Sequence, residues 1–303
     1  MTRQIKTIAE FHQYRGLPKP EHHLISVVDI ENVQHWHADE PLNLALDFYV
    51  IALKRVLSKG KVHYGQDQYY YNEGIMSFMS PNQIFSISKE KNEELKQSGW
   101  VLLIHPDFLW NTVLATKIKQ YEYFQYSANE ALMLSEKEEK TIIGIIENIQ
   151  QEYYSNIDNF SQDIIIAHLE TLLNYADRFY HRQFLTHKKV NHQILDKFEK
   201  LLLDYFRNDT VTQKGLPTVQ YVSEELNVSV SYLSRLLKTL TGQSTQQHIH
   251  DKLIEKAKER LSTTTLTVSE IAYELGFEHS QSFSKLFKKK TDISPLDFRN
   301  LFN

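Results

Sequence analysis

The chain has 303 residues, of which 41% are hydrophobic and 24% are charged, and its formal net charge is −4 at pH 7. This length is typical of about two domains, and the mild negative charge disfavours a protein that binds polyanions over its whole surface. Cysteine is absent, which excludes disulfides and cysteine-bound metals. Because no apolar run approaches the ~18 residues of a membrane span and the N-terminus lacks an apolar segment of signal-peptide length, we expect a soluble cytoplasmic protein.

Residues 22–105 are expected to form β-strands over most of their length. Short apolar or aromatic runs such as HLISVVDI, LALDFYVIAL and WVLLIH are separated by Gly, Pro, Asn and Asp, which is typical of strands joined by turns. Because no long helical pattern interrupts these runs, they indicate an antiparallel sandwich or barrel.

Two amphipathic helices are predicted within residues 136–185. The first follows Ser135, which lies three residues before Glu138 and so suits a capping box. Apolar stripes at helical spacing are formed by Ile142, Ile145, Ile146 and Ile149 in the first helix and by Ile165, Leu169, Leu172, Ala176 and Phe179 in the second. The stripes suit either packing on the sheet or pairing with a second copy. We predict a homodimer through 136–185, because they hold more apolar surface than one sheet face requires.

The C-terminal region contains an internal repeat. Residues 218–244 (TVQYVSEELNVSVSYLSRLLKTLTGQS) align with residues 267–294 (TVSEIAYELGFEHSQSFSKLFKKKTDIS) at an offset of 49 that becomes 50 after the turn of each unit. The first predicted helix of each unit ends near a residue that tolerates left-handed backbone, Asn227 or Gly276. A second helix follows after a short turn, so each unit has a helix-turn-helix signature.

The second helices of the two units have matching faces when they are projected at about 100° per residue. The inner face is apolar and contains Leu233, Leu236 and Leu237 in the first unit and Phe283, Leu286 and Phe287, with Lys290, in the second. The opposite face is polar or basic and contains Ser231, Arg235 and Lys238 in the first unit and Gln281, Lys285 and Lys288 in the second. A polar helix face is usually only solvated, but its recurrence in a helix-turn-helix repeat favours contact with DNA.

These side chains have the chemistry that double-stranded DNA requires. Arg and Gln offer paired hydrogen bonds to guanine and adenine edges in the major groove. Lys288, Lys289 and Lys290 lie at the far end of the helix, where contacts to phosphate fix the register without reading sequence. Because residues 216–303 carry 11 Lys and Arg against 10 Asp and Glu, DNA binding must depend on where the charges lie.

A connecting helix of about 17 residues is predicted between the two units, because Ile249, Leu253, Ala257 and Leu261 recur every four residues. Such a helix is about 25 Å long. This length roughly agrees with the ~34 Å of one turn of DNA. The two second helices could therefore enter successive major grooves on one side of the duplex.

Residues 191–303 resemble the AraC/XylS family of bacterial transcriptional regulators. The second unit carries the family's most specific residues at family spacing: Gly276-Phe277, Phe283, Phe287-Lys288, Pro295 and Phe298-Arg299. The segment YLSRLLK with Gly242, and Leu253, Ala257 and Leu261 of the connecting helix, are also similar to the family. The chain departs from the family pattern at Leu237, Lys252 and Asp292, where Phe, Arg and Gly are frequent, and none of these lies on the predicted DNA face.

The resemblance implies a seven-helix DNA-binding domain at residues 186–303. It also implies that residues 1–185 form an effector-binding and dimerisation domain. The expected fold class is α+β, with an N-terminal cupin-like antiparallel β-barrel and trailing helices, then an all-α domain of two helix-turn-helix units joined by a linker helix. The base contacts that the resemblance implies are Ser231, Ser234, Arg235, Gln281, Ser282 and Lys285, and the predicted DNA-binding set also includes Lys238, Ser284, Lys288 and Lys289.

The predicted effector site is less specific. Alternate residues of a strand point inward, so aromatic residues of the barrel suit either a core or a ligand site: Trp36, Tyr49, Tyr64, Tyr70 and Phe78. His35, His37 and Glu40 suggest a metal site. However, metal-binding cupins add a later His where this chain has Gln83, and His63 could replace it only if the strands placed it there. We therefore predict no metal and no cofactor.

The sequence predicts a sequence-specific DNA-binding transcriptional regulator that is not an enzyme and that a small effector controls. One alternative is a cupin-type metalloenzyme that its C-terminal domain recruits to DNA, and another is a constitutive DNA binder with a structural N-terminal domain. No nucleophile motif, phosphate loop or H-E-x-x-H pattern is present.

Overall fold

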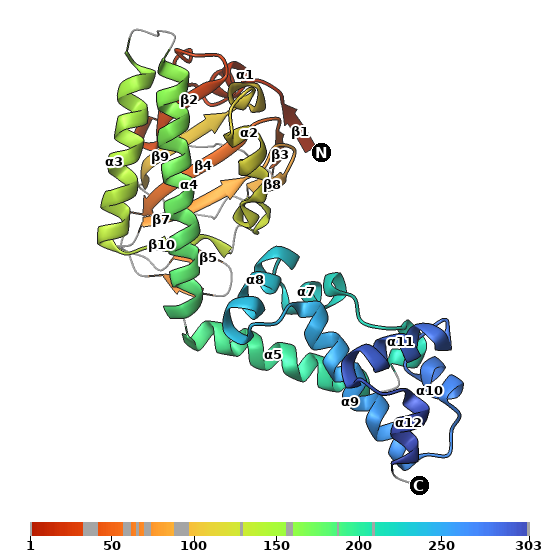
Figure 1. Cartoon of the computed structure of the whole chain (residues 1–303). Coiled ribbons are helices and arrows are strands. Elements are labelled where there is room, and N and C mark those ends of the chain that lie inside the picture. The colour runs from red at the N-terminus through yellow and green to blue at the C-terminus, as the bar shows by residue number, and fades with distance from the viewer. Residues whose placement is uncertain are drawn as a thin grey trace. The chain divides into compact units, whose positions relative to one another are not determined.

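The computed structural model describes residues 2–32, 42–56, 62–64, 67–69, 74–87, 97–127, 130–155, 160–186, 188–207 and 210–301. The chain divides into two compact units, Met1–Gln183 and Phe184–Asn303. The first unit combines β-sheets with helices, and the second is helical (Figure 1). This division lies next to the domain boundary expected between residues 185 and 186.

The first unit contains two β-sheets and a hairpin. Its strands are β1 (Thr2–Ile5), β2 (Ile25–Asp29), β3 (Leu42–Leu46), β4 (Tyr49–Val56), β5 (Val62–Tyr64), β6 (Asp67–Tyr69), β7 (Gly74–Met79), β8 (Ile84–Ile87), β9 (Gln97–Ile104) and β10 (Leu132–Leu134). The five-stranded sheet has the order β10-β7-β4-β9-β2, the three-stranded sheet has the order β1-β3-β8, and β5 pairs with β6. Neighbouring strands are antiparallel except β1 and β3, which run parallel.

The strands in the described ranges form open sheets and no closed barrel, so the expected cupin-like barrel is not found among them. The sheets pack on each other through aliphatic side chains, with Ile5, Leu44 and Leu46 from the smaller sheet and Val28, Val50 and Leu103 from the larger. Helix α1 (Ile8–Tyr14) adds Ile8 to this core, and its N-cap residue Thr7 accepts a hydrogen bond from the Glu10 amide at 3.1 Å. The space between the sheets is therefore filled at this end.

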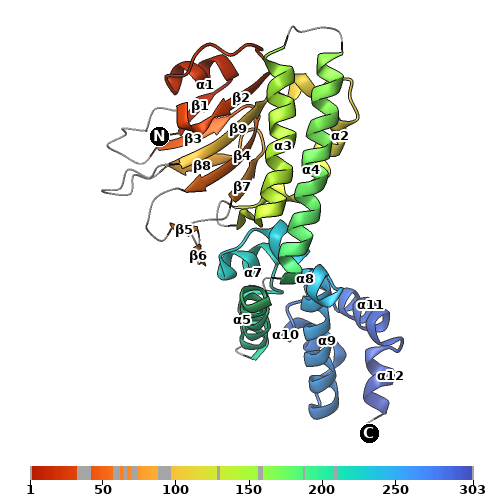
Figure 2. The ribbon, with the colours of Figure 1, turned by 90° about the vertical axis from the view of Figure 1, so that its left-hand side faces the viewer.

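Helices α3 (Glu136–Tyr153) and α4 (Ser161–Thr186) cover the opposite face of the five-stranded sheet (Figures 1 and 2). Their predicted stripes are buried within the unit, and the exposed fraction is 0% for Ile142, Ile146, Ile149, Leu169, Leu172 and Ala176. The expectation that these stripes hold surplus apolar surface is therefore wrong, because the sheet covers them.

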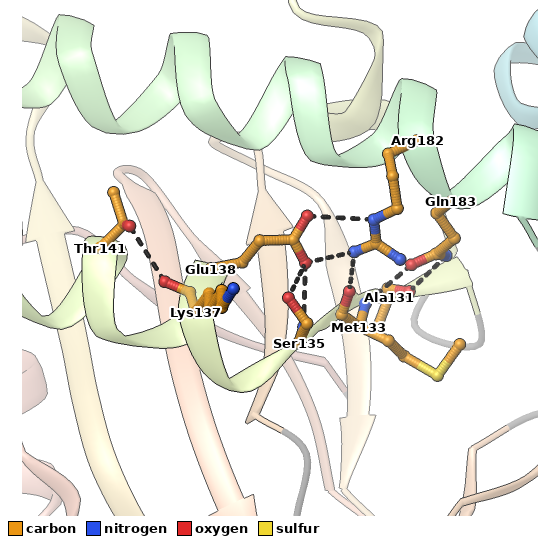
Figure 3. A network of polar contacts seen from close by, with 8 residues as sticks. All are labelled: Ala131, Met133, Ser135, Lys137, Glu138, Thr141, Arg182 and Gln183. Atoms are coloured by element: carbon orange, nitrogen blue, oxygen red, sulfur yellow. Dashed lines mark hydrogen bonds and ion pairs between the residues drawn. The ribbon is translucent and has the colours of Figure 1, made fainter.

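A polar network fastens the C-terminal end of α4 to β10 and to the start of α3 (Figure 3). The predicted capping box of Ser135 and Glu138 is present, and Arg182 extends it by donating to Glu138 Oε1 at 3.0 Å and to Glu138 Oε2 at 2.7 Å. Gln183 accepts a hydrogen bond from the Met133 amide at 2.8 Å. The last turns of α4 are thus held by both charge and backbone contacts.

Short helices complete the first unit, namely η1 (Ile30–Asn32), η2 (Pro106–Leu109), α2 (Leu114–Lys117), η3 (Ile118–Gln120) and η4 (Glu122–Gln125). Tyr123 of η4 is buried beneath α4, where its ring stacks on Tyr180 with centroids 5.3 Å apart. Its hydroxyl donates to the Leu173 carbonyl at 2.9 Å.

The second unit consists of α5 (Lys188–Arg207), α6 (Thr210–Lys214), α7 (Val219–Leu226), α8 (Val230–Thr241), α9 (Thr245–Thr263), α10 (Val268–Glu274), α11 (Ser280–Thr291) and α12 (Pro295–Asn300). The short helix α6 is additional to the seven helices that the family resemblance implies. Helix α9 joins two apolar cores, because Ile249 packs with α5, α7 and α8, whereas Leu253, Ala257 and Leu261 pack with α10 and α11. Within the described ranges, no helix combines the length and apolar character that crossing a membrane requires.

Candidate nucleic-acid interface

The first helix-turn-helix unit is formed by α7 and α8. Thr218 caps α7 by accepting a hydrogen bond from the Tyr221 amide at 3.0 Å, and Ser229 caps α8 in the same way through the Tyr232 amide at 3.2 Å. Between them Asn227 adopts φ 55°, the left-handed conformation that ends a helix. The turn therefore has the residue types that its backbone requires, as the sequence predicted.

The second unit is formed by α10 and α11. A capping box joins Thr267 and Glu270, with the Thr267 amide donating to Glu270 Oε2 at 2.7 Å. Hydrogen bonds from Thr267 lower the pKa of the Glu270 carboxyl, so this cap is charged at neutral pH. After α10, Gly276 adopts φ 80°, and a side chain there would lie 3.0 Å from the backbone of Gly215 and Leu216. The turn thus needs glycine for both conformation and space.

Helix α11 has one buried and one exposed face. Phe283 and Phe287 are fully buried, and their rings contact Phe277 and Phe298 at centroid distances of 5.5 and 5.6 Å. On the other side lie exposed residues from the predicted DNA-binding set: Gln281, Ser282, Lys285, Lys288 and Lys289. None of these three lysines forms an ion pair with a residue in the described part of the chain. The sixth predicted residue of this helix, Ser284, is half-buried and donates to the Ser280 carbonyl at 3.0 Å.

Lys290 differs from the two lysines that precede it. Its Nζ donates to Asp251 Oδ1 of α9 at 2.6 Å, and Asp251 Oδ2 accepts from Gln243 at 3.0 Å. This ion pair disfavours the expectation that Lys290 contacts phosphate together with Lys288 and Lys289. Its helical position turns it toward α9, so it fastens α11 to the connecting helix.

The predicted DNA-binding residues of α8 are less exposed than those of α11. Lys238 is exposed, whereas Ser231, Ser234 and Arg235 are half-buried. Ser234 shares a hydrogen bond with the buried Thr245 hydroxyl at 3.3 Å, which turns its oxygen toward α9. The predicted residues of α8 are thus brought together on one helix, but Ser234 has a partner within the unit.

Phe184 is a contact of Arg235 that sequence reasoning missed. Its fully buried ring lies 5.1 Å from the ring of Tyr232, and the Arg235 guanidinium lies over it at 5.8 Å. Arginine stacks favourably on aromatic faces, so Phe184 orients a predicted base-contacting side chain. The sequence gives only a weak signal of this role, because Phe184 lies in a segment that resembles a linker.

The predicted effector residues in the first unit fall in two groups. Trp36 and Tyr70, like the metal candidates His35, His37 and Glu40, lie outside the described residues, and so do the side chains of Tyr64 and His63. Tyr49 and Phe78 are buried on the sheet face that α4 covers, where Phe78 contacts Tyr123 at 4.5 Å.

Tyr49 packs on Phe124 at 5.3 Å, and burial raises the pKa of its phenol. These contacts favour the core interpretation for Tyr49 and Phe78. Gln83, which stands where a metal-binding His was sought, accepts from the Ser80 amide at 3.1 Å and donates to the Tyr126 carbonyl at 3.4 Å. Among the described residues, no group of three His, Cys, Asp or Glu suits a metal ion.

Two helix-turn-helix units on one connecting helix define a helix-turn-helix protein, and comparison with known proteins supports this class. Residues 222–301 match the family model described as a helix-turn-helix domain. An uncharacterized HTH-type transcriptional regulator of Pseudoalteromonas carrageenovora is 33% identical over 99 residues, which are 33% of this chain and 57% of that protein. The xylose operon regulatory protein of Escherichia coli K12 is 32% identical over 99 residues, 33% of this chain and 24% of that protein.

Among solved structures, the C-terminal domain of the response regulator AraT from Geobacillus stearothermophilus is 32% identical, with 36% of this chain and 84% of that chain covered and a TM-score of 0.32. The C-terminal domain of the response regulator yesN from Fusobacterium nucleatum is 35% identical, with 33% and 96% covered and a TM-score of 0.29. The matches span less than two thirds of the curated relatives. Over residues 222–301 of its C-terminal unit, the chain is thus similar to helix-turn-helix regulators of the AraC type, in agreement with the family resemblance of the sequence.

Proposed function

We propose that this protein is a sequence-specific DNA-binding transcriptional regulator. The observation that carries the proposal is the exposed polar face of α11. Polar residues also occupy the equivalent positions of α8 in the other helix-turn-helix unit, where Lys238 is exposed and Ser231 and Arg235 are half-buried. Relatives whose names state a role in transcription support the same function.

In this proposal α11 enters the major groove. Gln281 lies in its first turn and Lys285 one turn later, so both can reach base edges, where an amide pairs with adenine and an ammonium with guanine. Lys288 and Lys289 lie in the last turn and contact phosphate. Their ammonium groups, which form no ion pair within the described residues, would supply the salt-dependent part of the affinity.

Helix α8 contributes the second contact. Ser231, Arg235 and Lys238 recur at successive turns, and a cation–π contact with Phe184 helps to hold the Arg235 side chain. Helix α9 has 19 residues and a length of about 28 Å, which suits recognition helices in successive grooves about 34 Å apart.

We also propose that the first unit controls DNA binding through a small effector and that residues 136–185 contribute to a homodimer. The aliphatic stripes of α3 and α4 are used within the unit, so dimerisation needs other apolar surface. Tyr154, Phe160 and Ile164 supply some, with exposed fractions of 60%, 68% and 41%. Exposed apolar groups near the adjoining ends of two helices suit contact with a second copy.

Selection of duplexes from a random-sequence library by the full-length chain tests the DNA-binding function. We expect one enriched motif, and Gln281→Ala should weaken binding to it by about 1–3 kcal/mol while relaxing the preference at particular base pairs. Lys252→Ala is the matched control, because Lys252 pairs with Glu255 on α9 at 2.7 Å and does not lie on the proposed face. Failure to enrich any sequence, or equal loss with both variants, would contradict the proposal.

A further inference from the structure

Two helices of the second unit pass through both of its apolar cores. The core around the first helix-turn-helix unit contains Phe198 of α5 and Ile249 of α9, and the core around the second contains Tyr205 of α5 and Leu253 of α9. The helices α5 and α9 therefore carry both helix-turn-helix units. Apolar packing has no preferred direction, so it restricts small movements of one unit against the other less than polar contacts of defined geometry do.

A carboxylate lies on α9 between these two cores. Asp251 follows Ile249 by two residues and precedes Leu253 by two. Its Oδ1 accepts a hydrogen bond from Lys290 Nζ at 2.6 Å, and Lys290 lies in the last turn of α11. Its Oδ2 accepts from Gln243 Nε2 at 3.0 Å, and Gln243 comes directly after the residue that caps the end of α8. One side chain thus joins the C-terminal ends of both proposed DNA-contacting helices.

The contacts of Asp251 differ from the ion pairs that α9 forms along its own surface. Glu255 accepts from Lys252 of the same helix at 2.7 Å, and such a pair supports a helix without connecting it to another element. Asp251 instead has partners on two other segments. The side chains of Asp251 and Lys290 are 42% and 26% exposed, and ion pairs in such a setting contribute little to stability. We therefore expect this contact to affect the placement of α11 more than the free energy of unfolding.

The other end of α11 is also held against the first helix-turn-helix unit. Gly276, in the turn before α11, lies so close to Gly215 and Leu216 that a side chain there would be 3.0 Å from their backbone. Gly215 and Leu216 lead into α7, and the Gly215 carbonyl accepts from the Tyr205 hydroxyl of α5 at 3.0 Å. Helix α11 has 12 residues and is about 18 Å long. Contacts near both of its ends therefore fix its direction relative to the first helix-turn-helix unit.

We propose that Asp251 is a positioning residue that sets the distance between α8 and α11, and thereby the spacing of the two operator segments that the protein accepts. Asp251 acts through Lys290 and Gln243 and needs no contact with DNA. One added base pair moves the two segments apart by about 3.4 Å and rotates one against the other by roughly 35°, a change that a fixed pair of helices cannot follow. This inference rests on the proposed function, because spacing matters only if α8 and α11 bind one duplex.

Operators of altered spacing test this role with the full-length protein. The two segments are located in the selected motif as the base pairs whose preference Arg235→Ala and Gln281→Ala relax, and one base pair is inserted or deleted between them. We expect the wild type to lose affinity about tenfold or more for either change, because one helix then misses its base edges. Asp251→Ala should reduce this spacing penalty about threefold, the amount that a partly exposed ion pair can contribute.

Three further variants show whether the effect belongs to the contact itself. Glu255→Ala is the matched control, because it removes a carboxylate of α9 whose partner lies on the same helix, and it should keep the wild-type penalty. Lys290→Met removes the same contact from α11 and should act like Asp251→Ala. Exchange of the two charges, Asp251→Lys with Lys290→Asp, should restore the penalty. The melting temperature of each variant should stay within a few degrees of the wild-type value.

The outcomes separate this inference from the proposed function. Equal spacing penalties for the wild type and Asp251→Ala overturn the inference, as does a wild type that tolerates both changes of spacing. A loss of affinity that is the same for all operators, or that Glu255→Ala shares, assigns Asp251 to stability alone and also overturns it. If the chain enriches no motif, the proposed function fails and this inference with it, whereas an enriched motif with an unchanged penalty overturns this inference alone.

Discussion

Leu172→Ala tests whether the apolar stripe of α4 is core or interface. The Leu172 side chain is fully buried within the first unit, so its truncation should lower the free energy of unfolding by about 2–5 kcal/mol through lost burial and a residual cavity. For a unit of this size such a change lowers the melting temperature by roughly 10 °C. Thr171→Ala is the control, because Thr171 is exposed on the same helix next to Leu172 and should change stability by about 0.5 kcal/mol or less.

Calorimetry of both variants over a wide range of protein concentration distinguishes the two roles. A core residue gives a shift of the first unit's transition that does not depend on concentration, because the buried contacts lie within one chain. An interface residue gives a loss that grows on dilution, because association contributes to the stability of a dimer. A shift for Leu172→Ala no larger than that for Thr171→Ala, or one that appears only on dilution, would refute the assignment of α4 to the core.

Two further pairs of variants test the second unit. Lys289→Ala should remove a phosphate contact and so lower the slope of log affinity against log salt concentration by about 1. Lys290→Ala should leave that slope unchanged, because Lys290 is paired with Asp251. Equal slopes for the two variants, measured by DNA titration at several salt concentrations, would contradict this distinction. Gly276→Ala should lower the free energy of unfolding, measured with denaturant, by about 1–3 kcal/mol. Gly242→Ala should lower it less, because both glycines have positive φ but, of the two, only at Gly276 would a side chain lie within 4 Å of other backbone. An equal loss for the two variants would show that backbone conformation alone decides the effect.

The helix-turn-helix units were predictable because their signals are local. The capping residues, the left-handed turn residues and the spacing of Phe283 and Phe287 act within a few residues of each other, so the sequence determines the helices and the buried side of α11. The capping box at Ser135 and Glu138 was predictable for the same reason. The exposure of Lys285 followed directly from the helical period.

The strands of the first unit were less predictable. Alternation along β4 places Tyr49 and Val50 on opposite faces of the sheet, but the sequence does not determine which of these faces packs against the helices. Tyr49 and Phe78 were expected in the barrel interior and instead pack beneath the helical layer. The parallel pairing of β1 with β3 joins segments about forty residues apart, and such pairing depends on the whole sheet, not on a local pattern.

Tertiary packing also decided which charged and apolar side chains have a partner. The helical period placed Lys290 near the buried side of α11, but only the position of α9 gives it Asp251. The stripes of α3 and α4 suited a sheet or a second copy equally well, and the five-stranded sheet covers them. A periodic pattern fixes the direction of a side chain relative to its own element, whereas its partner comes from a distant segment that only the complete fold brings near.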